Sequence, residues 1–329
     1  MVLILGRRDV QQAVSMADAI ETVERAFIDL SCGEAYAPVR LSLFVPERDG
    51  SVHYMPAYLP RASALGAKIV STFPHNREIG KATIHAVLVL SDPGTGEILA
   101  IMEAGYLTAL RTGAASAVAT RHLARPDARV VAIFGAGVQG RSQLEAVSAV
   151  RDIERVWIYD PNRLAADRYA KEMSVRGNRI PSDVRVASSP VEAVSDADII
   201  CTATPSRQPL FADRDLKSGV HINAIGAFRP EMQEVPSETV ARARLVVDCH
   251  EACMAEAGDL IIPMRQGLIA REQCTAELGH VAAAILPGRT SNEQITLFKS
   301  VGNAVQDVSV AQLVFEQARL LHLGEEVSL

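Results

Sequence analysis

The sequence has few cysteines and lacks a long apolar run. Its five cysteines are an odd set without CxxC spacing, so neither a disulfide framework nor a zinc site is expected. No run of about 18 apolar residues occurs that could span a membrane. Charges follow residues 1–5 closely, the reverse of a secretory signal. We therefore expect a cytoplasmic protein without membrane contact.

The chain also has no excess of positively charged residues. The 33 lysines and arginines stand against 39 aspartates and glutamates, a formal net charge of −6. Nucleic-acid binding depends on clustered basic residues that release counterions, so no nucleic-acid partner is expected. Glycine and proline are dispersed and 48% of residues are hydrophobic, which indicates a folded globular chain. Its 329 residues suit two domains.

One segment, Cys249–Cys253, carries two thiols with a histidine between them. Such a CxxxC spacing could bind a metal ion. The segment follows the apolar run 245–247, which favours structural thiols instead. No metal site is predicted.

The first third of the chain predicts a helix and then a sheet. Apolar residues recur at helical spacing over 15–33, between a capping Ser15 and a terminating Gly33. Consecutive strands with short turns form a mainly antiparallel sheet, and an alanine-rich helix at 105–124 leads out of it. The predicted strands cover 39–46, 51–60, 65–74, 84–90 and 97–103.

Strands and helices alternate from residue 129. The predicted strands are 129–134, 155–160, 198–204, 221–227 and 244–249, with helices at 138–151 and 164–176. This alternation indicates a doubly wound parallel sheet. We expect a last helix, about 303–323, to pack on the first domain. The fold class is therefore α/β, with a Rossmann domain (116–303) and a discontinuous, mainly antiparallel α+β domain (1–115 and 304–329).

The string GAGVQG at 135–140 matches the dinucleotide motif G-x-G-x-x-G, with a strand before it and a helix after it. Gly135 permits a tight turn, Gly137 lets a pyrophosphate approach, and Gly140 allows close helix packing. Val138 and Gln139 begin the helix whose N-terminus would hold the phosphate. A nucleotide-free glycine turn or a methyltransferase-like site is the alternative to dinucleotide binding.

The next predicted strand ends in Asp160. Its carboxylate can accept hydrogen bonds from the adenosine ribose hydroxyls and would repel a 2′-phosphate, which favours NAD(H). Arg163 lies close enough in sequence to weaken this exclusion. NADP(H) therefore stays open.

Arg40, Lys68 and Arg111 are lone cations in apolar segments. Each alone is more often a side chain on a solvated face. Together they suggest a pocket for a small carboxylate, because arginine offers a rigid fork of donors. Lys68, partly desolvated among cations, could have a lowered pKa and move a proton.

Several segments resemble the ornithine cyclodeaminase/mu-crystallin family. They are 66–70 (GAKIV), 107–119 (LTALRTGAASAVA), the glycine loop, 221–226 (HINAIG), 256–260 (EAGDL) and 298–304 (FKSVGNA). The likeness runs in the same order through nearly the whole chain. It implies a homodimer of two-domain subunits, with an interrupted domain for substrate and dimerisation and a Rossmann domain for NAD(P).

The resemblance also implies roles for particular residues. The family's carboxylate-binding residues correspond to Arg40, Lys68 and Arg111, with Lys68 as the candidate catalytic acid or base. Thr83 and Ser300 correspond to cofactor-contacting positions. The candidate cofactor contacts are thus Thr83, Arg111, Gly135, Gly137, Val138, Gln139, Gly140, Asp160, Arg163 and Ser300.

Members of this family differ in chemistry after the position of Asn223. Ornithine cyclodeaminases resemble one another in an aspartate and a lysine where this chain has Phe228 and Met232. Without that carboxylate, a base for cyclodeamination is missing. The string 226–231 (GAFRPE) instead resembles mu-crystallin, which implies ketimine reduction. The expected activity is NAD(P)H-dependent reduction of a small cyclic imino acid, Δ1-pyrroline-2-carboxylate to proline or Δ1-piperideine-2-carboxylate to pipecolate.

Three alternatives remain open on the sequence. The chain could be an ornithine cyclodeaminase that converts ornithine to proline and ammonia, or an alanine-dehydrogenase-like amino-acid oxidoreductase. It could also be a non-catalytic, crystallin-like binding protein. The sequence does not choose between the two imino acids, or fix the direction of the reaction.

Overall fold

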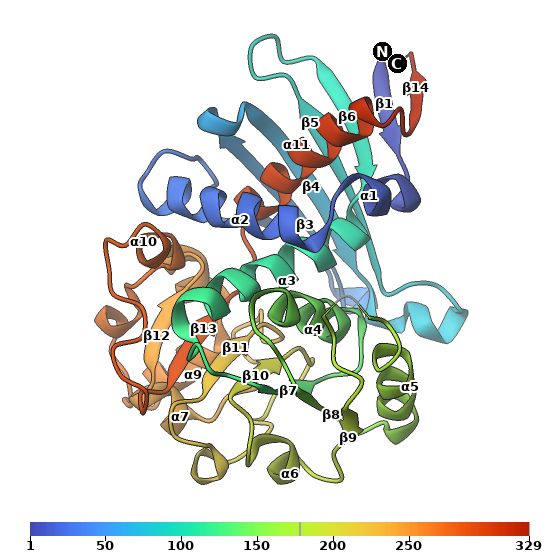
Figure 1. Ribbon diagram of the computed structural model, residues 1–329. Coiled ribbons are helices and arrows are strands. Elements are labelled where there is room, and N and C mark those ends of the chain that lie inside the picture. The colour runs from blue at the N-terminus through green and yellow to red at the C-terminus, as the bar shows by residue number, and fades with distance from the viewer. Residues whose placement is uncertain (178, 329) are drawn as a thin grey trace. The chain divides into compact units, whose positions relative to one another are not determined.

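The computed structural model describes residues 1–177 and 179–328, which divide into two compact units (Figure 1). Unit 1 comprises Met1–Arg111 and Asn303–Leu329, and unit 2 comprises Thr112–Gly302. The chain leaves unit 1 within helix α3 (Ala104–Leu123) and returns to it at the start of helix α11 (Ala304–Leu320). The domain limits expected from the sequence lie within a few residues of these.

Unit 1 is built on a seven-stranded sheet in the order β14-β1-β6-β5-β4-β3-β2. Strands β2 to β6 form the consecutive antiparallel hairpins that the sequence predicts. β1 pairs parallel with β6 and antiparallel with β14, so the sheet is mixed at this edge. The strands are β1 (Val2–Leu5), β2 (Leu41–Val45), β3 (Gly50–Leu59), β4 (Ala64–Thr72), β5 (Ile84–Ser91), β6 (Ile98–Glu103) and β14 (Glu325–Val327).

Helices cover one face of this sheet. α11 packs on β3, β4 and β5 and on helix α2 (Met16–Ser31), as expected from its apolar stripe. Ser15 caps α2 by accepting a hydrogen bond from the Asp18 N–H at 3.3 Å, and Asn303 caps α11. Helix α1 (Arg7–Ala13) and the short 3-10 turns η1 (Pro46–Arg48), η2 (Pro60–Ala62) and η3 (Pro74–Ile79) complete the unit.

Unit 2 is a doubly wound, seven-stranded parallel sheet in the order β12-β13-β11-β10-β7-β8-β9. The strand order reverses between β7 and β10, which is the point at which such sheets bind ligands. The strands are β7 (Val130–Phe134), β8 (Arg155–Tyr159), β9 (Val184–Val186), β10 (Ile199–Thr202), β11 (His221–Ala224), β12 (Arg244–Val247) and β13 (Thr296–Lys299). The remaining helices are α4 (Val138–Val150), α5 (Arg163–Met173), α6 (Pro190–Val194), α7 (Ser237–Arg242), α8 (His250–Glu256), α9 (Gly258–Arg265) and α10 (Leu278–Ala282), with 3-10 turns η4 (Asp213–Asp215) and η5 (Arg271–Cys274).

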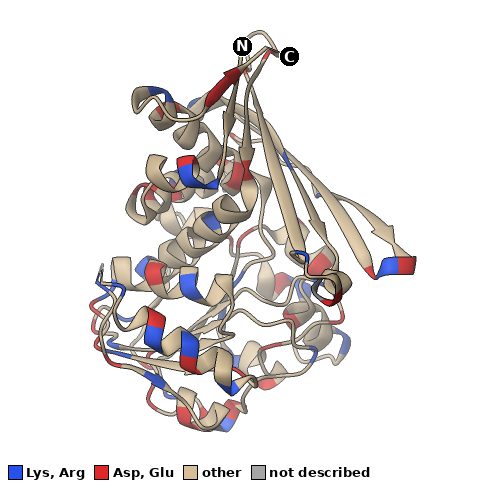
Figure 2. Ribbon diagram, turned by 90° about the vertical axis from the view of Figure 1, so that its right-hand side faces the viewer, with Lys and Arg blue, Asp and Glu red and all other residues tan. Residues whose placement is uncertain are grey.

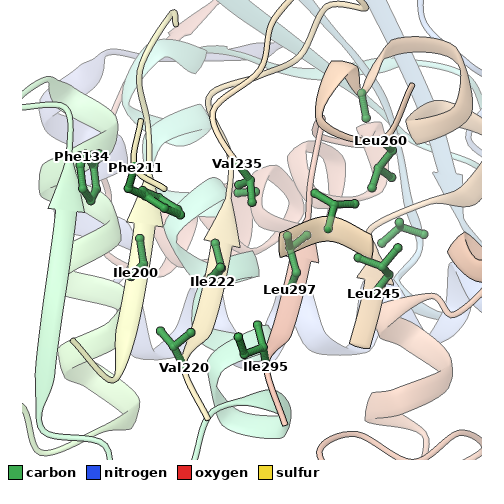
Figure 3. Packing of buried hydrophobic residues seen from close by; sticks show 14 of the residues in the cluster. Phe134, Ile200, Phe211, Val220, Ile222, Val235, Leu245, Leu260, Ile295 and Leu297 are labelled. Atoms are coloured by element: carbon green, nitrogen blue, oxygen red, sulfur yellow. The ribbon is translucent and has the colours of Figure 1, made fainter. Parts of the chain in front are cut away.

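Both faces of the unit 2 sheet are buried. Alternate residues of each strand point to opposite faces, so Ile200, Ile222 and Leu297 join one apolar cluster (Figure 3) while Ile199 and Cys201 join another. A sheet buried on both faces presents its functional groups only where its strands end. Among the described residues, no helix is long and apolar enough to cross a membrane.

Candidate functional site

The glycine-rich turn of unit 2 links β7 to α4, as its motif predicts. Gly135 has a φ of +103°, which residues with a side chain rarely adopt. A Cβ at Gly140 would collide with the Gly135 carbonyl oxygen, because α4 starts close against β7. Beside Gly137, no atom of the described residues other than its chain neighbours lies within 4 Å of where a Cβ would stand. The turn therefore fits a phosphate that approaches at Gly137.

The first turn of α4 is available to a ligand. Gly137 is its N-cap and supplies no side-chain hydrogen bond to the helix. Val138 is 60% exposed. The Gln139 Oε1 atom is buried and has no hydrogen-bond partner within the described part of the chain. The exposed first turn and the absence of a side-chain cap fit a pyrophosphate bound at this 13-residue helix.

Asp160 lies directly after β8 and is tied to the glycine turn. Its Oδ2 atom accepts a hydrogen bond from the Ala136 N–H at 2.9 Å, and its Oδ1 atom accepts one from the Asn162 N–H at 2.8 Å. The carboxylate of the motif is therefore positioned by the same loop that would hold the phosphates. Arg163 is exposed and forms an ion pair with Asp167, 3.2 Å away.

Arg141 is a further residue of this loop, and the sequence reasoning missed it. Its guanidinium donates to the carbonyl oxygens of Ala136 and Gly137 and pairs with Glu172 at 2.8 Å. It also lies over the ring of Tyr169, 5.1 Å from the ring centroid. Its place directly after the third glycine was the available signal.

Lys68 is the central residue of a charged cluster in unit 1. It lies on β4 on the same face as Ala64 and Gly66, since strand residues alternate, and this face is buried. The side chain is 1% exposed. Its Nζ atom donates to Asp307 Oδ1 at 2.8 Å and to Thr108 Oγ1 at 3.4 Å.

The pKa of Lys68 is lowered from 10.5 to about 7. Burial is the largest cause, and the positive charges of Arg111 and Arg40 lower the pKa further, while Asp307 opposes them. The structure thus brings the three sequence-predicted cations close enough to act on one another. A lysine with this pKa can give up or take a proton near neutral pH.

Asp307 and Gln306, on α11, complete this cluster and were not found from the sequence. Asp307 Oδ1 lies 2.9 Å from Arg111 Nε, and the other end of the guanidinium contacts Gln306 Oε1. Asp307 Oδ2 and Gln306 Nε2 are buried, and neither has a hydrogen-bond partner among the described residues. The signal was present, because both large polar residues stand in a buried stretch, 304–311, that otherwise holds only alanine, valine and Ser309.

Arg40 lies just before β2, although the sequence placed it inside that strand, and it is half-buried. Thr83 lies in the loop before β5, where its carbonyl accepts a hydrogen bond from the Phe73 N–H at 2.8 Å. Its cofactor contact stays a prediction.

Ser300 lies directly after β13 and is 1% exposed. Its hydroxyl donates to Asp248 Oδ2 at 2.7 Å, and the same oxygen accepts the N–H groups of Val301 and Gly302 at 3.0 and 2.8 Å. Asp248 therefore fixes the turn that carries Ser300. The other oxygen of Asp248 accepts a hydrogen bond from the Cys253 thiol at 3.2 Å.

Phe228 follows β11 and packs in part against the apolar cluster of Figure 3. The guanidinium of Arg229 lies 5.9 Å from its ring centroid. Met232 is buried. Neither position offers a base.

A family model described as the ornithine cyclodeaminase/mu-crystallin family matches residues 2–320. The Δ1-pyrroline-2-carboxylate reductase of Bacillus cereus is 41% identical over 326 residues, which cover 99% of this chain and 99% of that protein. The solved structure of Thermococcus litoralis Δ1-pyrroline-2-carboxylate reductase in complex with NADH and L-proline is 42% identical, with a TM-score of 0.96, and covers 99% of this chain and 100% of that one. An archaeal alanine dehydrogenase dimer with bound NAD is 37% identical, with a TM-score of 0.93 and 99% coverage of both chains.

The match extends over both the glycine turn of unit 2 and the buried cations of unit 1. The chain belongs to the ornithine cyclodeaminase/mu-crystallin family.

Proposed function

We propose that the protein reduces the C=N bond of Δ1-pyrroline-2-carboxylate with NADH and forms L-proline. The observation that carries this proposal is Lys68, a buried lysine that pairs with Asp307 and whose pKa is lowered to about 7 by burial and by the charges of Arg111 and Arg40. A substrate with one carboxylate and one imine nitrogen matches those charges. Relatives with 41% and 42% identity are named for this activity.

Substrate binding is assigned to the basic residues of unit 1. Arg40 and Arg111 bind the carboxylate, since a guanidinium forms two parallel hydrogen bonds with that group. Asp307 holds Arg111 and Lys68 through one oxygen and so fixes their spacing. Fixing the substrate in one orientation removes much of the entropic barrier to reaction.

Lys68 is the proton donor. In the cationic form it donates a proton to the imine nitrogen, which makes the ring carbon more electrophilic. NADH supplies the hydride that this carbon accepts. The C=N double bond becomes a C–N single bond, the nitrogen keeps the proton, and Lys68 regains one from water. The reverse reaction uses neutral Lys68 as the base.

The residues that would hold the dinucleotide are those of the glycine turn and of Asp160. Gly137 and the first turn of α4 would hold the phosphates, and Asp160 would accept hydrogen bonds from the adenosine ribose hydroxyls. The bond from Ala136 fixes the Asp160 carboxylate in place. A 2′-phosphate would meet this negative charge, so NADH is preferred to NADPH.

Purified protein is expected to oxidise NADH when Δ1-pyrroline-2-carboxylate is added, and to do so faster than with NADPH. The loss of nicotinamide absorbance at several substrate concentrations measures both rates. Δ1-Piperideine-2-carboxylate, ornithine and alanine are compared in the same assay. Ammonia release from ornithine would support a cyclodeaminase instead, and NADH formation from alanine an alanine dehydrogenase. No turnover with any imine contradicts the proposal.

The protein is also proposed to act as a homodimer in the cytoplasm. Leu41, Leu43 and Tyr54 are exposed on the sheet face of unit 1 opposite to Lys68, and Figure 2 shows few charged residues on these long strands. A second copy would cover this apolar face. All five cysteines are free thiols, which suits a reducing compartment. Light scattering is expected to give twice the chain mass of 35.4 kDa, and a monomer mass contradicts the dimer.

A further inference from the structure

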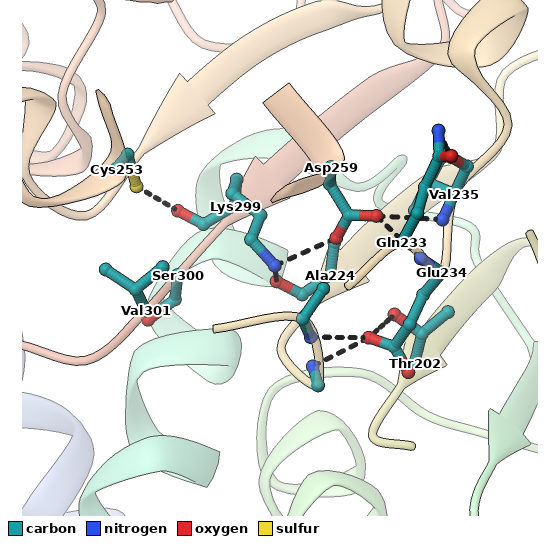
Figure 4. Close-up of polar contacts among 12 residues, drawn as sticks. Thr202, Ala224, Gln233, Glu234, Val235, Cys253, Asp259, Lys299, Ser300 and Val301 are labelled. Carbon is teal, nitrogen blue, oxygen red and sulfur yellow. Dashed lines mark hydrogen bonds and ion pairs between the residues drawn. The ribbon is translucent and has the colours of Figure 1, made fainter. Parts of the chain in front are cut away.

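Glu234 is a fully buried carboxylate in unit 2 that the reaction described above does not use. Its Oε1 atom accepts hydrogen bonds from the N–H and the hydroxyl of Thr204, at 2.7 and 2.8 Å. Its Oε2 atom accepts from the Thr202 hydroxyl at 2.9 Å and from the N–H groups of Gly226 and Ala227 at 2.7 and 3.1 Å. One side chain thus joins the ends of β10 and β11 (Figure 4).

These two strand ends approach each other very closely. A Cβ at Gly226 would collide with the backbone of Thr204 and with the Glu234 carboxylate. The loops therefore fit together only around this glycine and this carboxylate.

The backbone that carries Glu234 is fixed by a second buried carboxylate, Asp259 on α9 (Figure 4). Asp259 Oδ1 accepts the N–H groups of Glu234 and Val235 at 2.7 and 3.0 Å. Its Oδ2 atom accepts from Lys299 Nζ at 2.9 Å, and Lys299 also donates to the Ala224 carbonyl at 3.1 Å. The cation of this network therefore bonds to Asp259 and not to Glu234.

The charge on Glu234 does not stabilise the fold. Burial and then the negative charge of Asp259 raise the pKa of Glu234 from 4.5 to about 7, although Lys299 opposes this. Because folding raises this pKa, protonated Glu234 favours the folded state at low pH. That contribution to the stability of the fold is lost as the pH rises through about 7. A buried carboxylate whose charge lowers the stability of the fold points to a functional role.

The place of Glu234 in the sheet indicates that role. The glycine turn follows β7 and Asp160 follows β8, on one side of the point where the strand order reverses. Dinucleotides lie across this point, so the second mononucleotide half lies over the ends of β10 and β11. Thr204, Gly226 and Ala227 are the residues at those ends.

We propose that Glu234 is a positioning residue for the nicotinamide half of the dinucleotide, acting by holding the loops after β10 and β11 in one arrangement. This inference rests on the proposed use of NADH. The adenosine half, bound at the glycine turn and Asp160, does not depend on it.

The test is the substitution Glu234→Gln, with binding measured as well as turnover. A carboxamide has one oxygen, and its NH2 group faces N–H donors, so it can hold only one of the two loops. NADH affinity, followed by nicotinamide fluorescence, is expected to fall about tenfold, a change of about 1.4 kcal/mol. ADP contains the adenosine half and the second phosphate but neither the second ribose nor the nicotinamide, and its affinity is expected to stay within about twofold of the original.

A pH series provides a readout that a merely structural role would not give. When Glu234 is protonated, one of its oxygens carries a proton and donates a hydrogen bond. That oxygen then no longer accepts all the hydrogen bonds from its loop, which loosens the loop. The NADH affinity of the unsubstituted protein should therefore fall as the pH drops below about 7, the pKa of Glu234, and Glu234→Gln should remove this dependence. The charged groups that face Glu234 are Asp259 on α9 and Lys299 on β13, and both are unchanged in the variant.

A matched control uses Asp198, a carboxylate directly before β10. It lies at the start of that strand, whereas Glu234 binds the backbone at its end. It accepts hydrogen bonds from Arg125, Lys217 and the N–H groups of Arg129 and Val130. Asp198→Asn is expected to lower the melting temperature and leave the affinities for NADH and ADP unchanged.

If Glu234→Gln does not fold, Thr202→Val removes one donor and nearly keeps the side-chain shape. It is expected to weaken NADH binding about threefold, as for the loss of one hydrogen bond, without affecting ADP binding. Equal losses for both ligands, or no loss for either, in a folded variant would overturn the inference. Absence of NADH binding by the unsubstituted protein would overturn the proposed function, and the inference with it.

Discussion

Replacing Lys68 by methionine is expected to lower kcat for imine reduction about a thousandfold, within the range of general acid catalysis. Methionine fills the buried space on β4 but carries no proton. The unsubstituted protein should lose reductive activity as the pH rises through about 7, where Lys68 becomes neutral, and should gain activity for proline oxidation over the same range. Lys68→Met should show neither of these two changes of activity with pH. Initial rates in both directions between pH 5.5 and about 9 measure this.

The stability of the two proteins gives an independent check. The pKa of Lys68 is lower in the folded chain than its ordinary 10.5, so the unfolded chain holds more protons between pH 7 and 10.5. Stability of the original protein therefore rises with pH in this window, and that contribution is absent from Lys68→Met. Lys171→Met, an exposed lysine on α5, is the control for loss of a lysine. A Lys68→Met enzyme with near-normal kcat would exclude Lys68 as the proton donor.

Replacing Asp307 by asparagine is expected to destabilise the protein by about 3–5 kcal/mol, the usual result of removing one partner from a buried ion pair. Asp307 is completely buried and is the counter-charge of both Lys68 and Arg111. Asparagine has a similar size but removes the counter-charge that Lys68 and Arg111 share. Urea unfolding at neutral pH measures the loss.

Activity of Asp307→Asn should change in a specific direction. Asp307 raises the pKa of Lys68, so its removal lowers that pKa further and moves the decline of imine reduction to lower pH. Glu78→Gln, which breaks the exposed pair with His75, should leave stability almost unchanged, because solvent screens an exposed ion pair. An unchanged pH profile in folded Asp307→Asn would show that its charge does not act on Lys68.

Much of the fold could be predicted because its signals are local. Runs of alternating apolar and polar residues with short turns indicated β2 to β6. The glycine motif indicated a dinucleotide site because a strand precedes it and a helix follows it. β1 and β14 were missed because each is short and their pairing joins opposite ends of the chain. β13 was missed because it contains Lys299 and so does not form an apolar run in the sequence. Lys299 can nevertheless be buried, because its charge is paired with Asp259.

The site divides in the same way. Lys68, Arg111 and Arg40 could be found as cations out of place in apolar segments. Asp307 and Glu234 could not be assigned, since the groups they bond lie on other segments, and no local pattern shows which buried carboxylate faces which donor. Propensity and periodicity describe a segment, whereas a buried charge is explained by its partner.

The discontinuity of unit 1 sets the order in which the charged cluster around Lys68 can be completed during synthesis. Lys68 and Asp307 are 239 residues apart, and all of unit 2 is translated between them. A nascent chain can therefore form the nucleotide-binding sheet while the cations of the first segment still lack their carboxylate. Lys68, the proposed proton donor, reaches its folded-state environment only when α11 packs on the sheet of unit 1, so a chain that lacks α11 also lacks the proposed catalytic cluster.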